Sequence, residues 1–252
     1  MKKYTKALPT ILRSIEIETK NLGFNMASVP ETGILLKILA STMKPSSKFL
    51  ELGTGTGLST AWILDGMDRS SSLVSVDNDR NAISIAKKHL GHDKRVQFIE
   101  DDGTNFVESL HQNNQEGYDF IFADTWAGKY HHLEDILNKI NPGGLYVIDD
   151  MSPQENWPTD HPPKVKSLIE DLYSRSDFNM YNVMNWSTGI IIGRKGDIIP
   201  NLHKVDTVRN WLLDNINSEE GVLSENCQNM FKESLDQINN LKSSIINTIS
   251  TF

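Results

Sequence analysis

The sequence has one cysteine, Cys227, among its 252 residues. A single thiol excludes an internal disulfide framework and any zinc site built on several thiolates. The sequence also lacks a run of roughly 20 consecutive apolar residues, the length that a membrane-spanning helix needs. The N-terminal residues 1–4, of which Lys2 and Lys3 are basic, are not followed by the apolar core of a signal peptide. We therefore expect a globular, cytoplasmic protein without a membrane partner.

Positive charge is scarce as well. The chain has 25 Lys and Arg residues against 33 Asp and Glu residues, which gives a formal net charge of −8. This excess of negative charge repels nucleic acid, so we expect no nucleic-acid partner. Hydrophobic residues make up 38% of the chain, enough for a large core, and this composition is not typical of disorder.

Short apolar runs alternate with segments of helical period between residues 48 and 193. The expected strands are residues 49–52, 73–76, 96–99, 118–122 and 145–148, and the helical stripes lie within 82–90, 133–140 and 165–172. This alternation predicts an α/β fold with a Rossmann-like, doubly wound sheet, mostly parallel and covered by helices on both faces. Residues 178–184 and 188–193 predict an antiparallel closing pair.

The flanks divide the chain into three expected parts, which are N-terminal helices at 1–47, the core at 48–197 and a helical C-terminal extension at 198–252. Two helices are expected in the first part, with the apolar stripes Leu8, Ile11, Leu12, Ile15 and then Leu35, Ile38, Leu39. Apolar residues spaced near 3.5 residues from Phe231 to Ile249 form one seam in the extension. That seam packs on its own domain or on a partner helix, so a homodimer remains open.

A glycine-rich turn follows the first expected strand and opens a helix. Gly53, Gly55 and Gly57 allow a sharp turn and a close approach of a ligand to the backbone. The dinucleotide fingerprint G-x-G-x-x-G has Leu58 at its third glycine, and a P-loop needs a lysine that residues 51–59 lack. A phosphate has no obvious cation here, which makes a nicotinamide dehydrogenase the least favoured hypothesis.

Acidic residues follow the expected strands at the edge where open α/β sheets bind ligands. They are Glu51, Asp77, Asp101, Asp102, Asp124, Asp149 and Asp150. Carboxylates at one crevice repel a pyrophosphate, and they suit a ligand with positive charge and with hydroxyl and amine donors. S-adenosylmethionine has a sulfonium, an ammonium, a ribose diol and an adenine amine, and therefore fits.

These segments together resemble a known family, the class I S-adenosylmethionine-dependent methyltransferases. Within it they are most similar to the small-molecule O-methyltransferases related to catechol and caffeoyl-CoA O-methyltransferase. The resemblance covers residues 29–194, and its anchors are residues 51–59, 74–79, 98–104, 118–130 and 142–151. It implies an enzyme that transfers a methyl group to the hydroxyl of a small-molecule acceptor.

The resemblance also implies a cofactor site on the glycine loop and the neighbouring acids. Asp77 would accept both ribose hydroxyls, because a carboxylate offers paired acceptors; a helix cap is the other interpretation of this residue. The glycines would line the methionine part, and Asp102 with Gly103 would meet the adenine. The expected cofactor-binding residues are Glu51, Gly53, Gly55, Gly57, Ser59, Asp77, Asp102, Gly103, Asp124 and Trp126.

Metal-dependent members of the family hold a divalent cation at positions that correspond to Asp124, Asp149 and Asp150. Oxygen ligands of this kind favour magnesium, so Mg²⁺ is a second expected cofactor. The family usually has Asp-Asn at the second and third positions, whereas this chain has Asp-Asp. Three carboxylates would leave the site at about −1 after it binds a divalent ion.

The family's lysine, three residues after the first acid, is replaced by Ala127, which cannot accept a proton. The catalytic candidates are therefore Lys129 and His161. Lys129 would otherwise be a solvated lysine in the first turn of a helix, and His161 an exposed loop histidine. Trp126 and Trp157 would wall an aromatic acceptor, or else pack in the core or anchor loops.

Two alternative functions keep the cofactor and change the reaction. One is an N- or carboxyl-methyltransferase without a metal, in which the acids after the fifth strand bind the substrate. The other is a non-catalytic module that binds S-adenosylmethionine, which the missing lysine at position 127 motivates.

Overall fold

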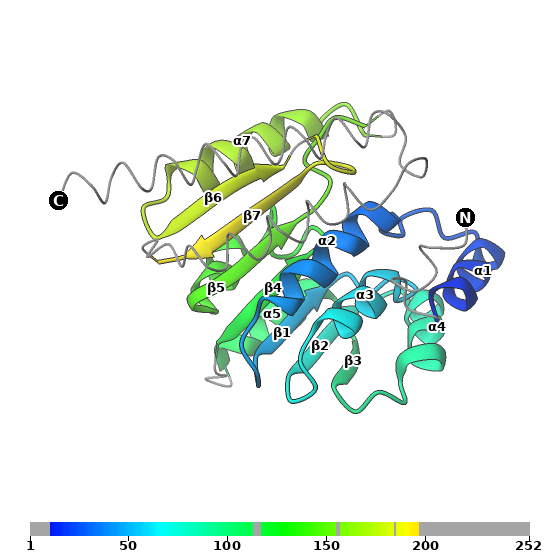
Figure 1. The fold of residues 1–252 in the computed structure, drawn as a ribbon. Coiled ribbons are helices and arrows are strands. Elements are labelled where there is room, and N and C mark those ends of the chain that lie inside the picture. Colours follow the sequence, from blue (N-terminus) through cyan, green and yellow to red (C-terminus); the bar gives the residue numbers. More distant parts are fainter. Residues whose placement is uncertain (1–10, 113–116, 155–156, 184, 197–252) are drawn as a thin grey trace, which may run out of the picture. The chain divides into compact units, whose positions relative to one another are not determined.

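The acidic strand ends belong to one seven-stranded sheet in the computed structural model, which describes residues 11–112, 117–154, 157–183 and 185–196. Its strands are β1 Lys48–Leu52, β2 Ser72–Asp77, β3 Val96–Glu100, β4 Tyr118–Ala123, β5 Ile140–Ile148, β6 Phe178–Val183 and β7 Ile190–Lys195. Their order is β3-β2-β1-β4-β5-β7-β6 (Figure 1). Strands β1 to β5 are parallel, and β7 runs antiparallel to both β5 and β6. The predicted mostly parallel sheet with an antiparallel closing strand is confirmed.

Helices cover both faces of the sheet (Figure 1). One face carries α1 Leu12–Leu22, α2 Pro30–Ser41, α3 Leu58–Gly66 and α4 Arg80–Leu90, and the other carries α5 Gly103–Gln112, α6 Leu133–Asn138 and α7 His161–Ser174. Helix α5 was not predicted, although Phe106, Val107 and Leu110 form its buried stripe. These three layers give the predicted doubly wound architecture.

Alternate residues of the strands contribute to two separate hydrophobic cores, one on each face of the sheet. Phe120 and Phe122 of β4 point to the core under α2 and α3, whereas Ile121 and Ala123 point to the core under α5 to α7. All six residues of β4 are buried, as expected for a central parallel strand covered on both faces. Full burial of each large apolar side chain contributes about 1.5–3 kcal/mol, which holds the strand ends rigidly in place.

Helix α2 buries a different face from the one that the sequence predicts. Its buried residues are Thr32, Gly33, Leu36 and Ala40, whereas the predicted stripe of Leu35, Ile38 and Leu39 is only half-buried. A Cβ atom on Gly33 would lie 2.1 Å from the indole of Trp62 in α3. The missing side chain at Gly33 therefore brings α2 onto α3 and fixes the face that α2 buries.

The carboxyl ends of β1 and β4, which we call the crevice, lie where the strand order of the sheet reverses. The chain runs from β1 outward to β2 and β3 on one side, and from β4 outward to β5 on the other. The loops after β1 and β4 consequently diverge, which is the topological switch point where open α/β sheets bind ligands. This crevice is the candidate site.

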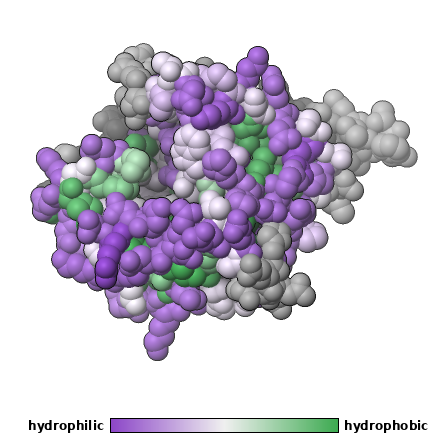
Figure 2. Space-filling model, turned by 180° about the vertical axis from the view of Figure 1, so that it is seen from behind, coloured by the Kyte–Doolittle hydropathy of each residue, from purple (hydrophilic) through white to green (hydrophobic). Residues whose placement is uncertain are grey.

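The described part of the chain contains no helix that is long and apolar enough to span a membrane. The face shown in Figure 2 is mainly hydrophilic, with hydrophobic residues in small separate areas. The predicted extension at 198–252 and its seam lie outside the described residues, as does Leu8. The three-part division of the chain therefore stays a prediction.

Candidate functional site

The glycine loop after β1 folds through left-handed backbone conformations. Gly53, Gly55 and Gly57 have φ angles of 101°, 51° and 93°, which side chains disfavour and glycine adopts freely. The amides of Gly53 and Thr54 donate to the carbonyl of Val76 at 2.9 and 3.2 Å. The loop is therefore tied across the end of β2.

The three glycines meet different neighbours. A Cβ atom on Gly53 would lie 2.7 Å from the carbonyl oxygen of Asp124, and one on Gly57 would lie 2.8 Å from the Cβ of Ala86 in α4. A Cβ atom on Gly55 would lie 3.1 Å from the ring of Phe24. Gly53 thus permits the approach of the loop to β4, and Gly57 permits helix packing. Their contact with a cofactor stays a prediction.

Asp77 lies at the end of β2 and faces the loop. Its carboxylate accepts hydrogen bonds from the amides of Gly55, at 2.6 Å, and Asp79, at 2.8 Å. Asp79 caps α4 instead, because its side chain accepts from the amides of Asn81 and Ala82. The helix-cap interpretation of Asp77 is therefore wrong, and its carboxylate is held at the rim of the crevice.

Asp102 and Gly103 follow β3, the strand beside β2. Asp102 accepts from the amide of Thr104 at 2.8 Å and from the side chain of Asn78 at 3.2 Å, and these bonds lower its pKa. A Cβ atom on Gly103 would lie 2.8 Å from the Cβ of the buried Ala127. Residues from three strand ends therefore meet at this part of the rim.

Glu51 lies beneath the loop in a network of hydroxyl groups. Thr60 and Ser75 donate to its Oε2 atom at 2.5 and 2.6 Å, and its Oε1 atom is buried without a partner among the described residues. Burial raises the pKa of Glu51 to about 7, against the opposing effect of the hydroxyls of Ser59, Ser75 and Thr60. Ser59 is 3% exposed. Both residues anchor the loop from below, and their contact with a cofactor stays a prediction.

Asp124 and Asp149 form a buried acid cluster after β4 and β5, and hydroxyl groups surround it. Ser28 donates to Asp124 Oδ2 at 3.2 Å, and Thr32 donates to Asp149 Oδ2 at 2.7 Å. Thr188 donates to Asp149 Oδ1. Burial raises the pKa of Asp124 to about 7 and also raises the pKa of Asp149. The three hydroxyls come from the segment before α2, from α2 itself and from the segment before β7.

Lys129 points into this cluster, so the prediction of a solvated lysine is wrong. Its side chain is 5% exposed, and its Nζ atom lies 3.0 Å from the carbonyl oxygen of Asp149 and 3.7 Å from Oδ1 of Asp124. Gly128, at φ 82°, turns the backbone here, and the amide of Lys129 donates to the carbonyl of Trp126. The segment is a compact turn before α6, and it directs the lysine to the sheet edge.

The predicted metal ligands do not fit a divalent ion. Both oxygens of Asp149 accept protein hydrogen bonds, including one from the amide of Asp150 at 2.8 Å, and Gln154 donates to Asp150 Oδ1 at 2.7 Å. Lys129 already places a positive charge beside Asp124. Among the described residues, no three His, Cys, Asp or Glu side chains are placed to share a metal ion.

An aromatic cluster lies beside the acids. It consists of Trp126, Tyr130, Trp157 and His161, with ring centroids of neighbouring pairs 4.7 to 5.7 Å apart. His161 is 8% exposed and is the first residue of α7, so the interpretation as an exposed loop histidine is wrong. Trp126 is 45% exposed, and Nζ of Lys164 lies 4.7 Å from the centroid of its ring.

The surroundings of His161 favour the neutral form of its imidazole. Burial lowers its pKa below 6.5, and the positive charges of Lys129 and Lys164 lower it further. Its Nε2 atom lies 3.4 Å from the hydroxyl of Tyr130. A neutral imidazole next to the acid cluster can accept a proton at neutral pH.

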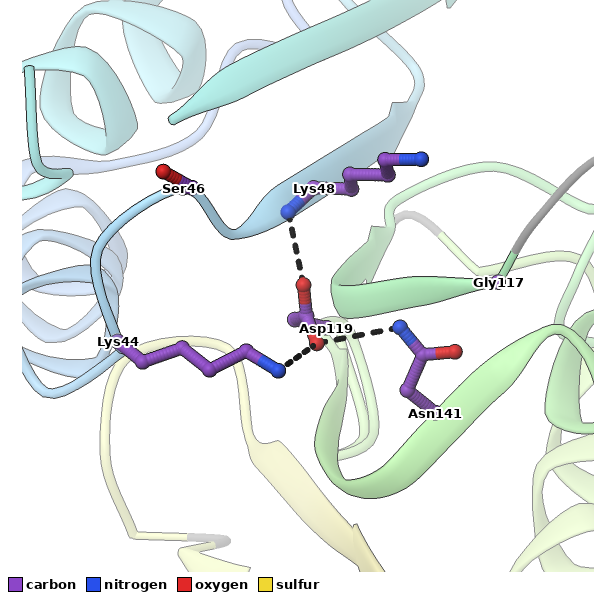
Figure 3. A pocket seen from close by; sticks show the side chains of 6 residues that line it. All are labelled: Lys44, Ser46, Lys48, Gly117, Asp119 and Asn141. Carbon is purple, nitrogen blue, oxygen red and sulfur yellow. Dashed lines mark hydrogen bonds and ion pairs between the residues drawn. The ribbon is translucent and has the colours of Figure 1, made fainter. Parts of the chain in front are cut away.

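A separate hollow of about 400 Å³ lies at the opposite edge of the sheet (Figure 3). Its Asp119 accepts from the amide of Lys48 at 2.9 Å and from Asn141 at 3.1 Å, and it pairs with Lys44 at 3.2 Å. These contacts tie together the amino ends of β1, β4 and β5. We assign this hollow a structural role.

Sequence reasoning missed the hydroxyls that surround the acids. Ser28, Thr32 and Thr188 lie 96, 117 and 39 residues from their carboxylate partners along the chain. No local pattern marks such residues, because only the folded sheet brings the partners together. Tyr130 was also missed, although it lies within an anchor segment of the family resemblance.

Comparison with known proteins agrees with this geometry. Residues 50–151 match a family described as a methyltransferase domain. A catechol O-methyltransferase of Niastella koreensis is 26% identical over 126 residues, which are 48% of this chain and 57% of that protein. A ribosomal protein L11 methyltransferase of Staphylococcus aureus is 28% identical over 50% of this chain and 39% of its own length. The matched regions thus cover less than two thirds of either relative.

A solved structure shares the fold over most of the chain. It is the O-methyltransferase TomG from Streptomyces achromogenes, in complex with S-adenosylmethionine, with a TM-score of 0.64 and 19% identity. The match covers 75% of this chain and 90% of TomG. Residues 50–151 of this chain thus match a methyltransferase domain, and the predicted resemblance to class I S-adenosylmethionine-dependent methyltransferases is confirmed.

Proposed function

We propose that this protein transfers the methyl group of S-adenosylmethionine to a hydroxyl of a small molecule. One observation carries the proposal: the left-handed loop of Gly53, Gly55 and Gly57 lies at the switch point between β1 and β4, within the matched methyltransferase domain. The amide of Gly55 is bonded to Asp77 there.

The cofactor would lie along this loop. The loop backbone and Asp124 would meet its methionine part, where negative charge favours the sulfonium and the ammonium. Asp77 would accept hydrogen bonds from the ribose hydroxyls. The carboxylate oxygen that accepts from the Gly55 amide still has a second lone pair for this purpose. Asp102 and Gly103, at the next strand end, would receive the adenine.

The acceptor would lie between the aromatic cluster and the segment before α2. Trp126 is 45% exposed, with Lys164 over its ring, and an aromatic acceptor would pack against this part of the cluster. Ser28 and Thr32 reach the acid cluster from residues 28–32, and this supports a role for the predicted N-terminal part as a lid. The acceptor class that these surfaces favour is a small aromatic alcohol.

Methyl transfer requires alignment of oxygen, methyl carbon and sulfur, and the exclusion of water. The sulfonium is already an activated leaving group, so the protein has to remove one proton from the acceptor hydroxyl. We assign this role to His161, whose neutral ring lies in the aromatic cluster.

We expect the protein to act in the cytoplasm, without a nucleic-acid or membrane partner.

Cofactor binding is tested by titrating the protein with S-adenosylhomocysteine in a calorimeter. We expect a one-to-one complex, and we expect Asp77→Ala to weaken it by about tenfold or more, because a charged hydrogen bond contributes about 1.5–3 kcal/mol. Asp171→Ala, on the exposed side of α7, is the matched control and should leave binding unchanged. No binding by the unmodified chain would contradict the proposal.

Transfer is tested with methyl-labelled S-adenosylmethionine and a panel of catechols, phenols and amines. Labelling of a hydroxyl supports the proposal, and labelling of amines alone would overturn it in favour of the N-methyltransferase. We expect kcat/KM to rise with pH through a pKa below 6.5, because His161 has to be deprotonated. His161→Gln should lower the rate by about 10²–10⁴ and remove that acid limb.

A further inference from the structure

We propose that the ammonium group of Lys129 occupies the place of a divalent cation in the acid cluster and binds the acceptor oxygen itself. The proposal rests on the proposed function only for the identity of that oxygen. Its consequence for the protein is that methyl transfer needs no divalent metal ion.

The position of the lysine carries the inference. Nζ of Lys129 is enclosed between the carbonyl oxygen of Asp149 at 3.0 Å and Oδ1 of Asp124 at 3.7 Å, with 5% of the side chain exposed. These two oxygens belong to two of the residues that were predicted to hold a metal. One of the two is a backbone carbonyl, so the ammonium lies beside the predicted metal position, within ion-pair distance of the Asp124 carboxylate.

The number of donors leaves one for a ligand. A lysine ammonium has three N–H donors, and the two oxygens of Asp149 and Asp124 are the polar partners of Nζ among the described residues. The remaining N–H can hold the oxygen of an acceptor. A charge-assisted hydrogen bond of this kind stabilises the negative charge that develops as the hydroxyl loses its proton.

Electrostatics argue that the lysine is retained for its charge. Burying an ammonium is costly unless opposite charges and hydrogen bonds compensate it, and this chain places Asp124, Asp149 and Asp150 after the two nearest strands. Lys129 is thus an internal cation that compensates part of the negative charge of these carboxylates.

The reaction that follows balances without a metal. The acceptor oxygen, held by Lys129, forms a bond to the methyl carbon as the carbon–sulfur bond breaks. The electron pair of the broken bond stays on sulfur, which becomes the neutral thioether of S-adenosylhomocysteine. The hydroxyl proton passes to His161. Lys129 keeps all three of its protons throughout.

Metal binding tests the proposal independently of turnover. The full chain, freed of metal with a chelator, is titrated calorimetrically with MgCl₂ and MnCl₂. We expect no binding below millimolar concentration, and we expect Lys129→Ala to gain Mn²⁺ affinity by tenfold or more, because the carboxylates lose their internal cation. Lys44→Ala, which removes a lysine paired with Asp119 at the opposite sheet edge, is the matched control and should gain none.

Activity provides the second measurement. Methyl transfer by the unmodified protein should be unchanged in excess EDTA, and Lys129→Ala should lose on the order of 10²–10³ in kcat, as for removal of one oxyanion donor. Stoichiometric binding of Mg²⁺ by the unmodified chain, or loss of its activity in EDTA with recovery on adding Mg²⁺, would overturn the proposal. Both outcomes are read on the unmodified chain, so they stand even when the variant fails to fold.

The proposed function and this inference fail in different ways. Absence of S-adenosylhomocysteine binding contradicts the methyltransferase proposal and leaves the Mg²⁺ titration valid. Tight Mg²⁺ binding together with normal S-adenosylhomocysteine binding contradicts only the role of Lys129.

Discussion

Gly53 shows how a single residue holds the crevice in shape. Its φ of 101° strains any side chain, and a Cβ atom would also meet the carbonyl oxygen of Asp124 at 2.7 Å. Gly23, at φ 71°, ends α1, and a Cβ atom placed there would have no neighbour within 4 Å. Alanine substitutions at Gly53 and Gly23 therefore separate the free-energy cost of a left-handed backbone from the cost of a steric clash.

We expect Gly53→Ala to lower the free energy of unfolding by clearly more than about 2 kcal/mol and to weaken S-adenosylhomocysteine binding. Gly23→Ala should lower it by only about 1–2 kcal/mol, the cost of the left-handed conformation itself, and leave binding unchanged. Urea unfolding and calorimetry measure both quantities. Equal losses of stability for the two variants would show that the close approach to Asp124 is unimportant.

Glu51 makes stability depend on pH. Its pKa is about 7 in the folded protein and 4.5 in the unfolded chain, so between these values the folded state binds more protons. Its contribution to stability is therefore fully present below pH 4.5 and is lost as the pH rises to about 7.

Glu51→Gln removes this titration. Over that pH window we expect the stability of the variant, relative to the unmodified protein, to increase by roughly 3 kcal/mol, from about 1.4 kcal/mol per pKa unit. Urea unfolding at several pH values measures the difference. Asp124 and Asp149 also titrate, but they are present in both proteins and cancel in the comparison. A difference that stays constant with pH would contradict the raised pKa of Glu51.

Motifs predicted the residues whose position follows from a strand end, and they failed where a turn sets the direction. Asp77 and Asp124 lie at the ends of β2 and β4, so the strand pattern alone placed them at the crevice. The orientation of Lys129 depends on the left-handed Gly128 and on the turn from Trp126. Residue spacing suggested a solvated side chain, because spacing alone does not reveal the direction that this turn gives to the side chain.

At the scale of the element, α2 couples core packing to the site. Gly33 lies on Trp62 of α3, and its neighbour Thr32 donates to Asp149. The sequence showed that an apolar helix lies here, but not which of its faces is buried. The buried face is set by the contact of Gly33 with an indole 29 residues further along the chain. A search for periodic apolar residues does not detect this contact, because glycine has no apolar side chain.

Gly33→Ala tests this contact against helix propensity. Alanine is favoured over glycine within a helix by about 1 kcal/mol, so propensity alone predicts stabilisation. A Cβ 2.1 Å from the indole of Trp62 instead predicts a net loss of about 1–2 kcal/mol in the free energy of unfolding, as for other overpacked cores. Adding Trp62→Leu should reverse the sign of the Gly33→Ala effect in a double-mutant cycle. Stabilisation by Gly33→Ala alone would contradict the tight packing of α2 on α3.

At the scale of the whole molecule, the alternation of apolar runs was sufficient to predict the sheet and its helices. It was sufficient because a parallel sheet buried on both faces needs continuous apolar strands, and its crossovers need amphipathic helices. The alternation did not predict details that are set by long-range pairing. One such detail is the start of β5 at Ile140, where the pairing with β4 shifts register near Tyr118. The location of the candidate site follows from the topology of the sheet. The hydroxyl partners of its acids follow from contacts between distant parts of the chain.

The charge of the whole molecule gives a last prediction about which nucleoside it accepts. The chain has a net charge of −8, and its acidic strand ends meet at one crevice, while residues 51–59 contain no lysine or arginine. We expect S-adenosylhomocysteine to bind at least about 100-fold more tightly than NAD⁺ or ATP, because their phosphates are repelled there. Adenosine, which lacks phosphates, is the control, and its weak binding should not change with salt. Because salt screens repulsion between exposed charges, the discrimination against NAD⁺ should narrow between about 50 and about 500 mM NaCl. Calorimetry that found NAD⁺ bound as tightly as S-adenosylhomocysteine would refute a crevice built for a cationic nucleoside.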